Sequence, residues 1–348
     1  MTKYPLSICI PSNREHTCSK ATISSALNFC DLSSSELIVS DNSADIKKSR
    51  FWESINLDFF KYDSDAPTGS YQNWHNALKK SSGLYTGILS DDDLILNIDE
   101  SPVNYFEIDR NNVFGIKPII QLWNEKVGTY STNNFNIAND NAKDRVHTYI
   151  TKANGNNTTL YSFYKKNIFY DLMELSLHHP TKGGYVDWAF VTGLVSSGKV
   201  LIDPTKLLLY KNNNWFGTKE FINEQDQKLY NSCGLSKRGS NFSPLFRALD
   251  SFIYVARKSS PVNREEIIEA AKYIFEINFS AFYQKFKNNP HLFSEKEGIV
   301  ISKFNDHDSI EKKLDSSLAV IEVFKKDLVE KYLNFYNVSL EEDWGTIT

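Results

Sequence analysis

Short apolar runs alternate with amphipathic segments along the first hundred residues of the chain. Four of these runs predict buried strands, at 6–10, 36–40, 57–62 and 84–89. The segments between them predict helices, at 17–29, 45–54 and 69–81. Strands and helices that alternate at this spacing indicate an α/β fold with a mostly parallel sheet flanked by helices.

Polar clusters follow three of these four strands. They occupy 11–14, where Pro11 is expected to stop the first strand, then 41–43 and 91–93. In a parallel α/β sheet, ligands bind beyond the carboxyl ends of the strands. We therefore expect the three clusters to meet at one edge of the sheet and to form the functional site.

The middle of the chain carries weaker signals. Strands are predicted at 114–118, 119–123, 200–204 and 207–210, and helices at 164–177 and 185–197. The stretch 128–157 is rich in Asn, Thr and Gly, which favours a surface loop that covers a binding site.

Beyond residue 236 the pattern predicts helices only. In the last of them, apolar residues recur at steps of three and four from Leu314 to Tyr332. We therefore divide the chain into a main domain, 1–235, and a helical C-terminal domain, 236–348. Whether this helical region forms a homodimer, holds an acceptor or touches lipid stays open at this point.

Composition narrows the class of protein. The chain has 348 residues, of which 41% are hydrophobic and 24% charged, which is globular composition and too long for one ordinary core. A net charge of −4 gives no reason to expect a nucleic-acid partner. The four cysteines form no C-x-x-C pair, so neither zinc nor a disulfide framework has support.

No targeting or membrane segment is evident from the apolar pattern. The N-terminal residues lack the apolar core of a signal peptide, and no apolar run approaches 20 residues. We expect a cytoplasmic protein, with contact to the inner face of the membrane as an open alternative.

The triplet Asp91–Asp93, directly after a predicted buried strand, is the sharpest chemical signal. Three adjacent carboxylates repel one another, so a folded sheet edge needs a cation to offset them. Carboxylate oxygens suit Mg²⁺ or Mn²⁺, and such an ion could bind a diphosphate. The alternative interpretation is a solvated acidic turn.

Four ordered motifs resemble those of the inverting family 2 glycosyltransferases, which have the GT-A fold. They are Ile10–Arg14 (IPSNR), Val39–Ser43 (VSDNS), Gly69–Asn73 (GSYQN) with Ala77 and Ser82–Tyr85 (SGLY), and Ile88–Asp93 (ILSDDD). The likeness is firm to about residue 95 and does not extend to the helical region. It implies a Rossmann-like GT-A domain that binds a nucleotide-sugar, commonly a UDP-sugar.

The resemblance also implies roles for single residues. The nucleotide-sugar would be bound by Pro11, Ser12, Asn13, Arg14, Asp41, Asn73 and Asp91. Among these, Asp41 would accept a hydrogen bond from the base and Asp91 would lie near the ribose. Asp92 would be the main metal ligand with Asp93 beside it. Since Ser90 replaces the usual first acid, which two of the three aspartates hold the metal stays open.

An inverting transfer needs a base that takes the proton of the acceptor hydroxyl. The family keeps this carboxylate at the start of a helix, and Asp187 after Gly183 and Gly184 matches that place. A plain helix-capping role for Asp187 is the alternative. His178, His179 and Glu174 are further candidates for the base, and Lys211 is a candidate for neutralising the leaving diphosphate.

The sequence thus predicts a metal-assisted, inverting glycosyltransferase that acts on a glycan or lipid-linked glycan, such as a bacterial surface glycan. A nucleotidyltransferase is an alternative, although the loop 11–14 lacks the glycines that such enzymes carry. A non-catalytic glycan-binding protein is a second alternative. It would explain the 14% aromatic residues but not the acidic triplet.

Overall fold

The structure, a computed structural model, describes residues 4–99, 103–111, 113–304 and 309–340. Its strands are β1 Leu6–Ser12, β2 Glu36–Asp41, β3 Phe60–Asp63, β4 Tyr85–Ile88, β5 Leu94–Asn97, β6 Gly115–Asn124, β7 Gly128–Asn133, β8 Phe163–Lys165 and β9 Val200–Lys211. Its α-helices are α1 His16–Leu32, α2 Ile46–Glu53, α3 Ser70–Lys80, α4 Tyr105–Arg110, α5 Ala142–Lys152, α6 Lys166–Ser176, α7 Asp187–Ser196, α8 Lys219–Ser232, α9 Ser243–Ala256, α10 Arg264–Asn288, α11 Glu295–Ile301, α12 Ile310–Phe324 and α13 Asp327–Ser339. Short 3₁₀ helices are η1 Thr158–Tyr161, η2 Gly184–Val186, η3 Lys237–Phe242 and η4 Pro290–Leu292.

The strands form one sheet in the order β3-β2-β1-β4-β8-β6-β9-β5, and β7 pairs with β6. β1 is parallel to β2 and β4, and β2 is parallel to β3, as predicted. Further along, β6 and β9 are parallel, whereas β8 is antiparallel to both of its neighbours and β5 is antiparallel to β9. The sheet is therefore mixed, and its purely parallel part is the one that the apolar runs predicted.

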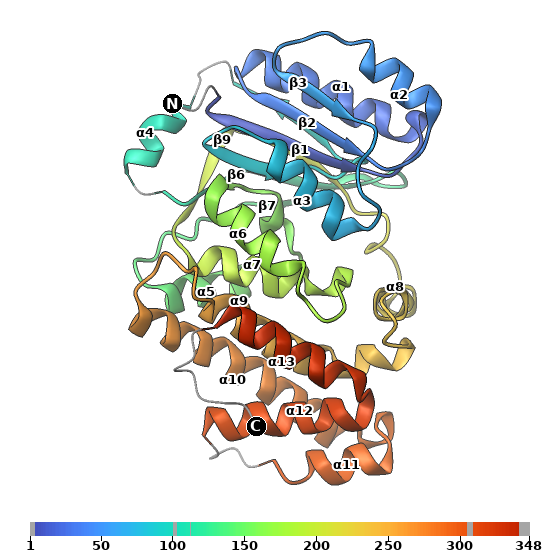
Figure 1. Ribbon diagram of the computed structural model, residues 1–348, viewed down its shortest axis with the longest axis vertical. Helices are drawn as coiled ribbons and strands as arrows, with labels where there is room; N and C mark the ends of the chain where they lie inside the picture. Colours follow the sequence, from blue (N-terminus) through green and yellow to red (C-terminus); the bar gives the residue numbers. More distant parts are fainter. Residues whose placement is uncertain (1–3, 100–102, 112, 305–308, 341–348) are drawn as a thin grey trace. The chain divides into compact units, whose positions relative to one another are not determined.

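Helices cover both faces of this parallel part: α1 and α2 lie on one face and α3 on the other (Figure 1). All six residues of β2 are buried, which explains why a continuous apolar run, rather than an alternating one, marks this strand in the sequence. Gly69 precedes α3 with φ of 96°, a backbone conformation that glycine adopts without strain. The predicted α/β fold is confirmed.

Pro11 does not stop β1, contrary to the prediction. It pairs with Ser40 of β2, and β1 continues to Ser12 opposite Asp41. Pairing with β4 ends earlier, at Cys9 and Ile88, where the carbonyl of Cys9 accepts the N–H of Leu89. Proline is tolerated here because its nitrogen faces the side on which β4 has already ended.

The stretch 128–157, predicted as a loop, contains β7 and α5. β7 is almost wholly exposed and forms through its backbone pairing with β6. β6 and β9 each replace two shorter predicted strands. Their pairing shifts in register between Pro118 and Ile119, which is where the predicted strands were separated.

Contacts divide the chain into two units. Unit 1 consists of Met1–Asp140, Thr148–Glu174 and Gly198–Phe216, and unit 2 consists of Asn141–His147, Leu175–Ser197 and Gly217–Thr348. In unit 2, α9 contacts α7, α10, α12 and α13. The described secondary-structure elements beyond residue 236 are all helices, as predicted, although α12 and α13 stand in place of one long helix. A domain boundary at 235/236 stays a prediction.

Within the part of the chain that the structure describes, no helix has both the length and the apolar character needed to cross a membrane.

Candidate functional site

The carboxylate of Asp91 accepts hydrogen bonds from residues 12–14, at the end of β1 and directly after it. Its Oδ2 accepts the Ser12 hydroxyl at 2.7 Å and the backbone N–H groups of Asn13 and Arg14, each at 3.1 Å. Its Oδ1 accepts the guanidinium Nη1 of Arg14 at 2.6 Å. The polar clusters after β1 and β4 therefore meet, as the parallel topology predicted, because Asp91 joins them.

Arg14 offsets the repulsion among the three aspartates. Its Nη1 lies 2.6 Å from Asp91 Oδ1 and 2.8 Å from Asp92 Oδ1. The Arg14 side chain is 39% exposed and that of Asp92 is 27% exposed, whereas Asp91 is buried. The cation that the sequence required at this turn is thus present in the chain itself, and it faces solvent together with Asp92.

Asp93 has a different environment, since it points into the sheet. Its Oδ1 accepts the backbone N–H of Lys211 in β9 at 2.7 Å, and its Oδ2 is buried with no hydrogen-bond partner. Burial raises the pKa of Asp93 well above its ordinary value, and the charge of Asp92 adds to this, while the Lys211 N–H acts in the opposite direction. Asp93 is thus enclosed by the protein, in contrast to the partly exposed Asp92.

Asp41, at the end of β2, joins the same network through Lys48. The Lys48 ammonium, on α2, lies 2.8 Å from Asp41 Oδ1 and also donates to the Ser12 hydroxyl at 2.6 Å. The Lys48 side chain is fully buried and that of Asp41 is 3% exposed. The other acceptor positions of Asp41 are filled by the Tyr62 hydroxyl and by the backbone N–H and hydroxyl of Ser43.

These contacts connect Asp41, Lys48, Ser12, Asp91, Arg14 and Asp92 into one polar chain across the ends of β1, β2 and β4. Asn73 of α3 joins it by donating to the Ser12 carbonyl at 3.3 Å, and its own Oδ1 is buried without a partner. Pro11 is half-buried and Asn13 exposed, at the same end of β1. All of the nucleotide-sugar residues expected from sequence therefore lie in or beside this network.

Lys48 and Tyr62 are the members that the sequence did not predict. Tyr62 lies in β3, whose apolar run gave no sign of a polar contact. For Lys48 a signal existed, because Trp52 lies four residues further on the same helix and is also buried. A lysine on the inward face of a short amphipathic helix indicates a buried acidic partner.

The donor set of the acidic turn limits the kind of metal ion that it can hold. Among the residues that the structure describes, no three His, Cys, Asp or Glu side chains are grouped so that they could hold a metal ion. Both oxygens of Asp91 already accept hydrogen bonds, which leaves the partly exposed Asp92 and the unpartnered Oδ2 of Asp93. Mg²⁺ is commonly bound by one or two carboxylates, with substrate phosphates and waters in the remaining positions. Asp92 is accessible to such an ion, whereas Asp93 can contribute its Oδ2 only if that buried oxygen becomes accessible, so a metal site at this pair stays a prediction.

Asp187 is the first residue of α7, in unit 2, and follows η2 as the glycine break predicted. Its Oδ1 accepts the N–H of Trp188 at 2.7 Å, and the N-cap position is occupied by Val186. The residue is half-buried and lies in the first turn of the helix. Asp187 does not occupy the N-cap, but an acidic residue in the first turn is itself favourable to a helix, so both its catalytic and its structural role stay open.

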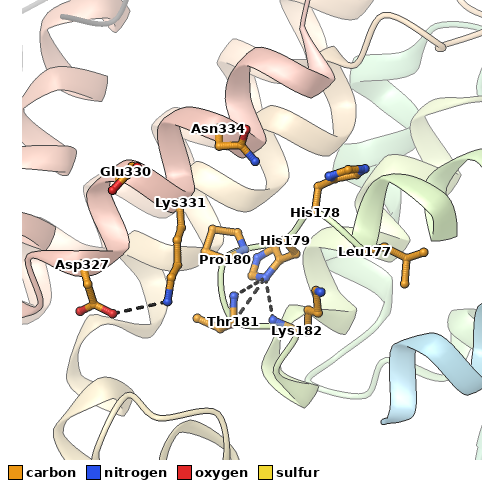
Figure 2. A pocket seen from close by; sticks show the side chains of 10 residues that line it. All are labelled: Leu177, His178, His179, Pro180, Thr181, Lys182, Asp327, Glu330, Lys331 and Asn334. Atoms are coloured by element: carbon orange, nitrogen blue, oxygen red, sulfur yellow. Dashed lines mark hydrogen bonds and ion pairs between the residues drawn. The ribbon is translucent and has the colours of Figure 1, made fainter. Parts of the chain in front are cut away.

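Both ring nitrogens of His179, one of the alternative bases, contact other groups of the protein. It lies in the wall of a unit 2 cavity of about 700 Å³ (Figure 2). Its Nδ1 accepts the N–H groups of Thr181 and Lys182 at 3.2 Å each, and its Nε2 lies 3.1 Å from Asp250 Oδ1. The side chain is fully buried, so it anchors the 178–183 loop, whereas His178 is exposed.

Lys211 is directed toward another acid rather than toward the turn. Its ammonium lies 2.5 Å from Glu125 Oε1 and 5.6 Å from the centre of the Trp123 ring. Only its backbone N–H contacts Asp93. The Lys211 side chain can therefore contact a diphosphate only if its ion pair with Glu125 breaks first.

Comparisons with known proteins give a likeness in three dimensions only. No family model matches the chain, and no curated protein matches its sequence. Among solved structures, Staphylococcus aureus TarS 1-349 resembles it with a TM-score of 0.48 and 12% identity over 95% of this chain and 90% of that one. The same protein in complex with UDP-GlcNAc gives a TM-score of 0.48, 12% identity and 95% and 83% coverage. In complex with UDP it gives 0.41, 11%, 96% and 89%.

Proposed function

We propose that the chain is a glycosyltransferase that moves a sugar from a nucleotide-sugar, with a UDP-sugar favoured, to a hydroxyl of an acceptor glycan. The observation that carries the proposal is the Asp91 contact set, which joins the ends of β1 and β4 and presents Arg14 and Asp92 to solvent at one edge of the sheet. This edge is where open α/β sheets bind nucleotides.

In the proposed complex, the backbone of 11–13 lines the nucleotide pocket and Asp91 lies near the ribose. Arg14 is the cation that contacts the diphosphate, because its guanidinium is 39% exposed and carries donors in a planar fork that suits phosphate oxygens. Asp91 keeps that guanidinium in place through three contacts with residues 13 and 14.

Asp92 and Asp93 would hold Mn²⁺ or Mg²⁺ in this complex. Such an ion supplies positive charge to the leaving diphosphate. On the side of the protein, Asp92 provides an accessible carboxylate, and Asp93 joins it only after its buried Oδ2 becomes accessible.

A base-binding role for Asp41 requires an exchange of hydrogen bonds. Its carboxylate accepts from Lys48, Tyr62 and Ser43, which fill the positions that a carboxylate offers. The Ser43 hydroxyl, at 3.1 Å, belongs to a half-buried residue and is the donor that a nucleotide base can replace.

The proposed reaction is a single displacement with inversion. The acceptor oxygen attacks the anomeric carbon, the bond from that carbon to the diphosphate oxygen breaks, and the acceptor proton passes to a carboxylate of the protein. Asp187 is the proposed acceptor of this proton, since it is a half-buried carboxylate at the start of α7, the place where the family that the sequence resembles keeps its base.

Calorimetric titration with UDP, GDP and dTDP, each with and without Mn²⁺, tests the proposed function. We expect UDP to bind more tightly when Mn²⁺ is present, because the diphosphate supplies oxygen ligands to the ion and the ion offsets the charge of the diphosphate. UDP-GlcNAc, which is bound to TarS in one solved structure, belongs in the panel of sugar donors. A chain that binds none of these nucleotides would be a glycan-binding protein or another kind of enzyme, and the proposal would be abandoned.

A further inference from the structure

A second cavity, of about 420 Å³, lies in unit 1 beyond the carboxyl end of β9. Its walls come from the β7 hairpin, the 152–156 turn after α5 and the 212–216 segment. Its lining includes side chains that are aromatic or carry an amide, among them Tyr130, Asn133, Phe135, Asn212, Trp215 and Phe216. None of them belongs to the polar network around Arg14.

The lining combines aromatic rings with amides and hydroxyls. It contains one charged side chain, the exposed Lys152, and no acidic side chain. Tyr130 is 38% and Trp215 is 37% exposed, so both rings are accessible. Ring faces pack on apolar C–H surfaces while neutral amides bond hydroxyl groups, which is the pair of contacts that a neutral saccharide needs.

Asn212 holds the Tyr130 side chain at the wall of the cavity. The residue is 5% exposed, and its Nδ2 donates to the Tyr130 hydroxyl at 2.6 Å. Tyr130 is therefore held in place before a ligand arrives.

The frame behind these residues is firmly held. Lys117, buried in β6, donates to Asn133 Oδ1 at 2.7 Å, and its ammonium lies 3.9 Å from the centre of the Phe135 ring. The Tyr130 and Phe216 rings are 4.8 Å apart between centroids. The cavity is thus preformed, as small-molecule sites usually are.

The cavity also adjoins the acidic turn. The N–H of Lys211 bonds Asp93 Oδ1 at 2.7 Å, and the next residue, Asn212, already lines the cavity. The wall of the cavity therefore begins one residue after the contact between Lys211 and Asp93, in the same unit as the proposed donor site.

We propose that this cavity is a subsite for a neutral saccharide unit of the acceptor, which is bound by the rings of Trp215 and Tyr130, with Asn212 as a positioning residue for Tyr130. The role as acceptor subsite rests on the proposed transferase function. Saccharide binding itself does not, so the two can fail separately.

The test is an array of immobilised oligosaccharides probed with the full chain. The neutral arm ends in glucose, galactose or N-acetylglucosamine, and the anionic arm carries sialic acid or sulfate. We expect binding in the neutral arm, weakened about tenfold or more by Trp215→Ala, retained in part by Trp215→Phe, and lowered by Asn212→Ala. Phe106→Ala, an exposed aromatic on α4 outside the cavity, is the matched control and should bind as the wild type does.

UDP titration of the same variants separates the two proposals, since Trp215→Ala should leave UDP affinity unchanged. Saccharide binding in a chain that binds no nucleotide would remove the transferase and leave the saccharide site. Binding of anionic saccharides only, no binding in either arm, or wild-type binding by Trp215→Ala would overturn the assignment of the cavity.

Discussion

Arg14 and Asp91 contact each other twice: the guanidinium Nη1 of Arg14 lies 2.6 Å from Asp91 Oδ1, and the backbone N–H of Arg14 donates to Asp91 Oδ2 at 3.1 Å. The double contact fixes both the side chain and the backbone of Arg14. A cation that is held in place before the ligand arrives binds a diphosphate with less loss of conformational freedom.

Arg14→Gln should therefore weaken UDP binding by about tenfold or more, since a charge-assisted hydrogen bond contributes roughly 1.5–3 kcal/mol. Affinity for Mn²⁺ should not fall, because Asp92 loses a competing cation. Calorimetry with UDP and with Mn²⁺ measures both. Arg110→Gln, an exposed arginine on α4, is the control. Equal UDP affinity in Arg14→Gln and the wild type would remove Arg14 from the diphosphate site.

The pair of Asp41 and Lys48 predicts a large effect on stability. Lys48→Met leaves the Asp41 carboxylate buried without its cation, and breaking a buried pair in this way costs about 3–5 kcal/mol. Urea unfolding measures the loss. The double variant Asp41→Asn, Lys48→Met should recover part of the lost free energy of unfolding. Lys47 is exposed, so Lys47→Met should leave the free energy of unfolding nearly unchanged. A Lys48→Met protein as stable as the wild type would contradict this assignment.

Lys117 predicts a dependence of stability on pH. Burial lowers the pKa of Lys117 from 10.5 to about 7, so between these values the unfolded chain binds a proton that the folded chain does not. Its contribution to the free energy of unfolding should therefore rise with pH across this window, by up to about 1.4 kcal/mol per pH unit. Urea unfolding at pH 7, 8 and 9 should show this slope in the wild type relative to Lys117→Met. Parallel pH profiles for the two proteins would refute it.

Asp187→Asn keeps the size of the side chain and so separates a catalytic from a structural role. If Asp187 takes the acceptor proton, turnover should fall by about 10²–10⁴-fold, with UDP affinity and melting temperature nearly unchanged. Single-turnover kinetics with a saturating UDP-sugar measures this. Near-normal turnover would contradict this role, and Glu174 and His178 would then be the next candidates for the base. His179 is a poor candidate for the base because its side chain is fully buried.

The parts of the fold that the sequence predicted are those in which local pattern and burial agree. Leu37, Ile38 and Val39 are fully buried in β2, and the acids and amides that follow the parallel strands lie at one edge because the strands are parallel. β7 could not be predicted in the same way, because its residues are exposed and its pairing comes from the backbone of β6. For α5 the signal was present, since Ala142, Val146 and Tyr149 are spaced along one buried face.

The site shows a similar division. The motifs brought Ser12, Asp41 and Asp91 into one predicted location, and the structure joins them through Lys48 and Arg14. What the sequence could not provide was the direction of each side chain. It required a cation at the acidic turn and suggested a metal ion, whereas the structure shows that Arg14 already meets part of that need.

The most direct test of the central claim is the release of UDP from a panel of UDP-sugars in the presence of Mn²⁺, measured for the wild type and for Asp92→Ala. We predict that at least one UDP-sugar is hydrolysed or transferred by the wild type, and that Asp92→Ala or EDTA abolishes this while the melting temperature is unchanged. Asp31→Ala, an exposed acid on α1, should retain full activity. Wild-type protein that releases no UDP from any donor would contradict the account, and release that survives both Asp92→Ala and EDTA would contradict its metal-assisted form.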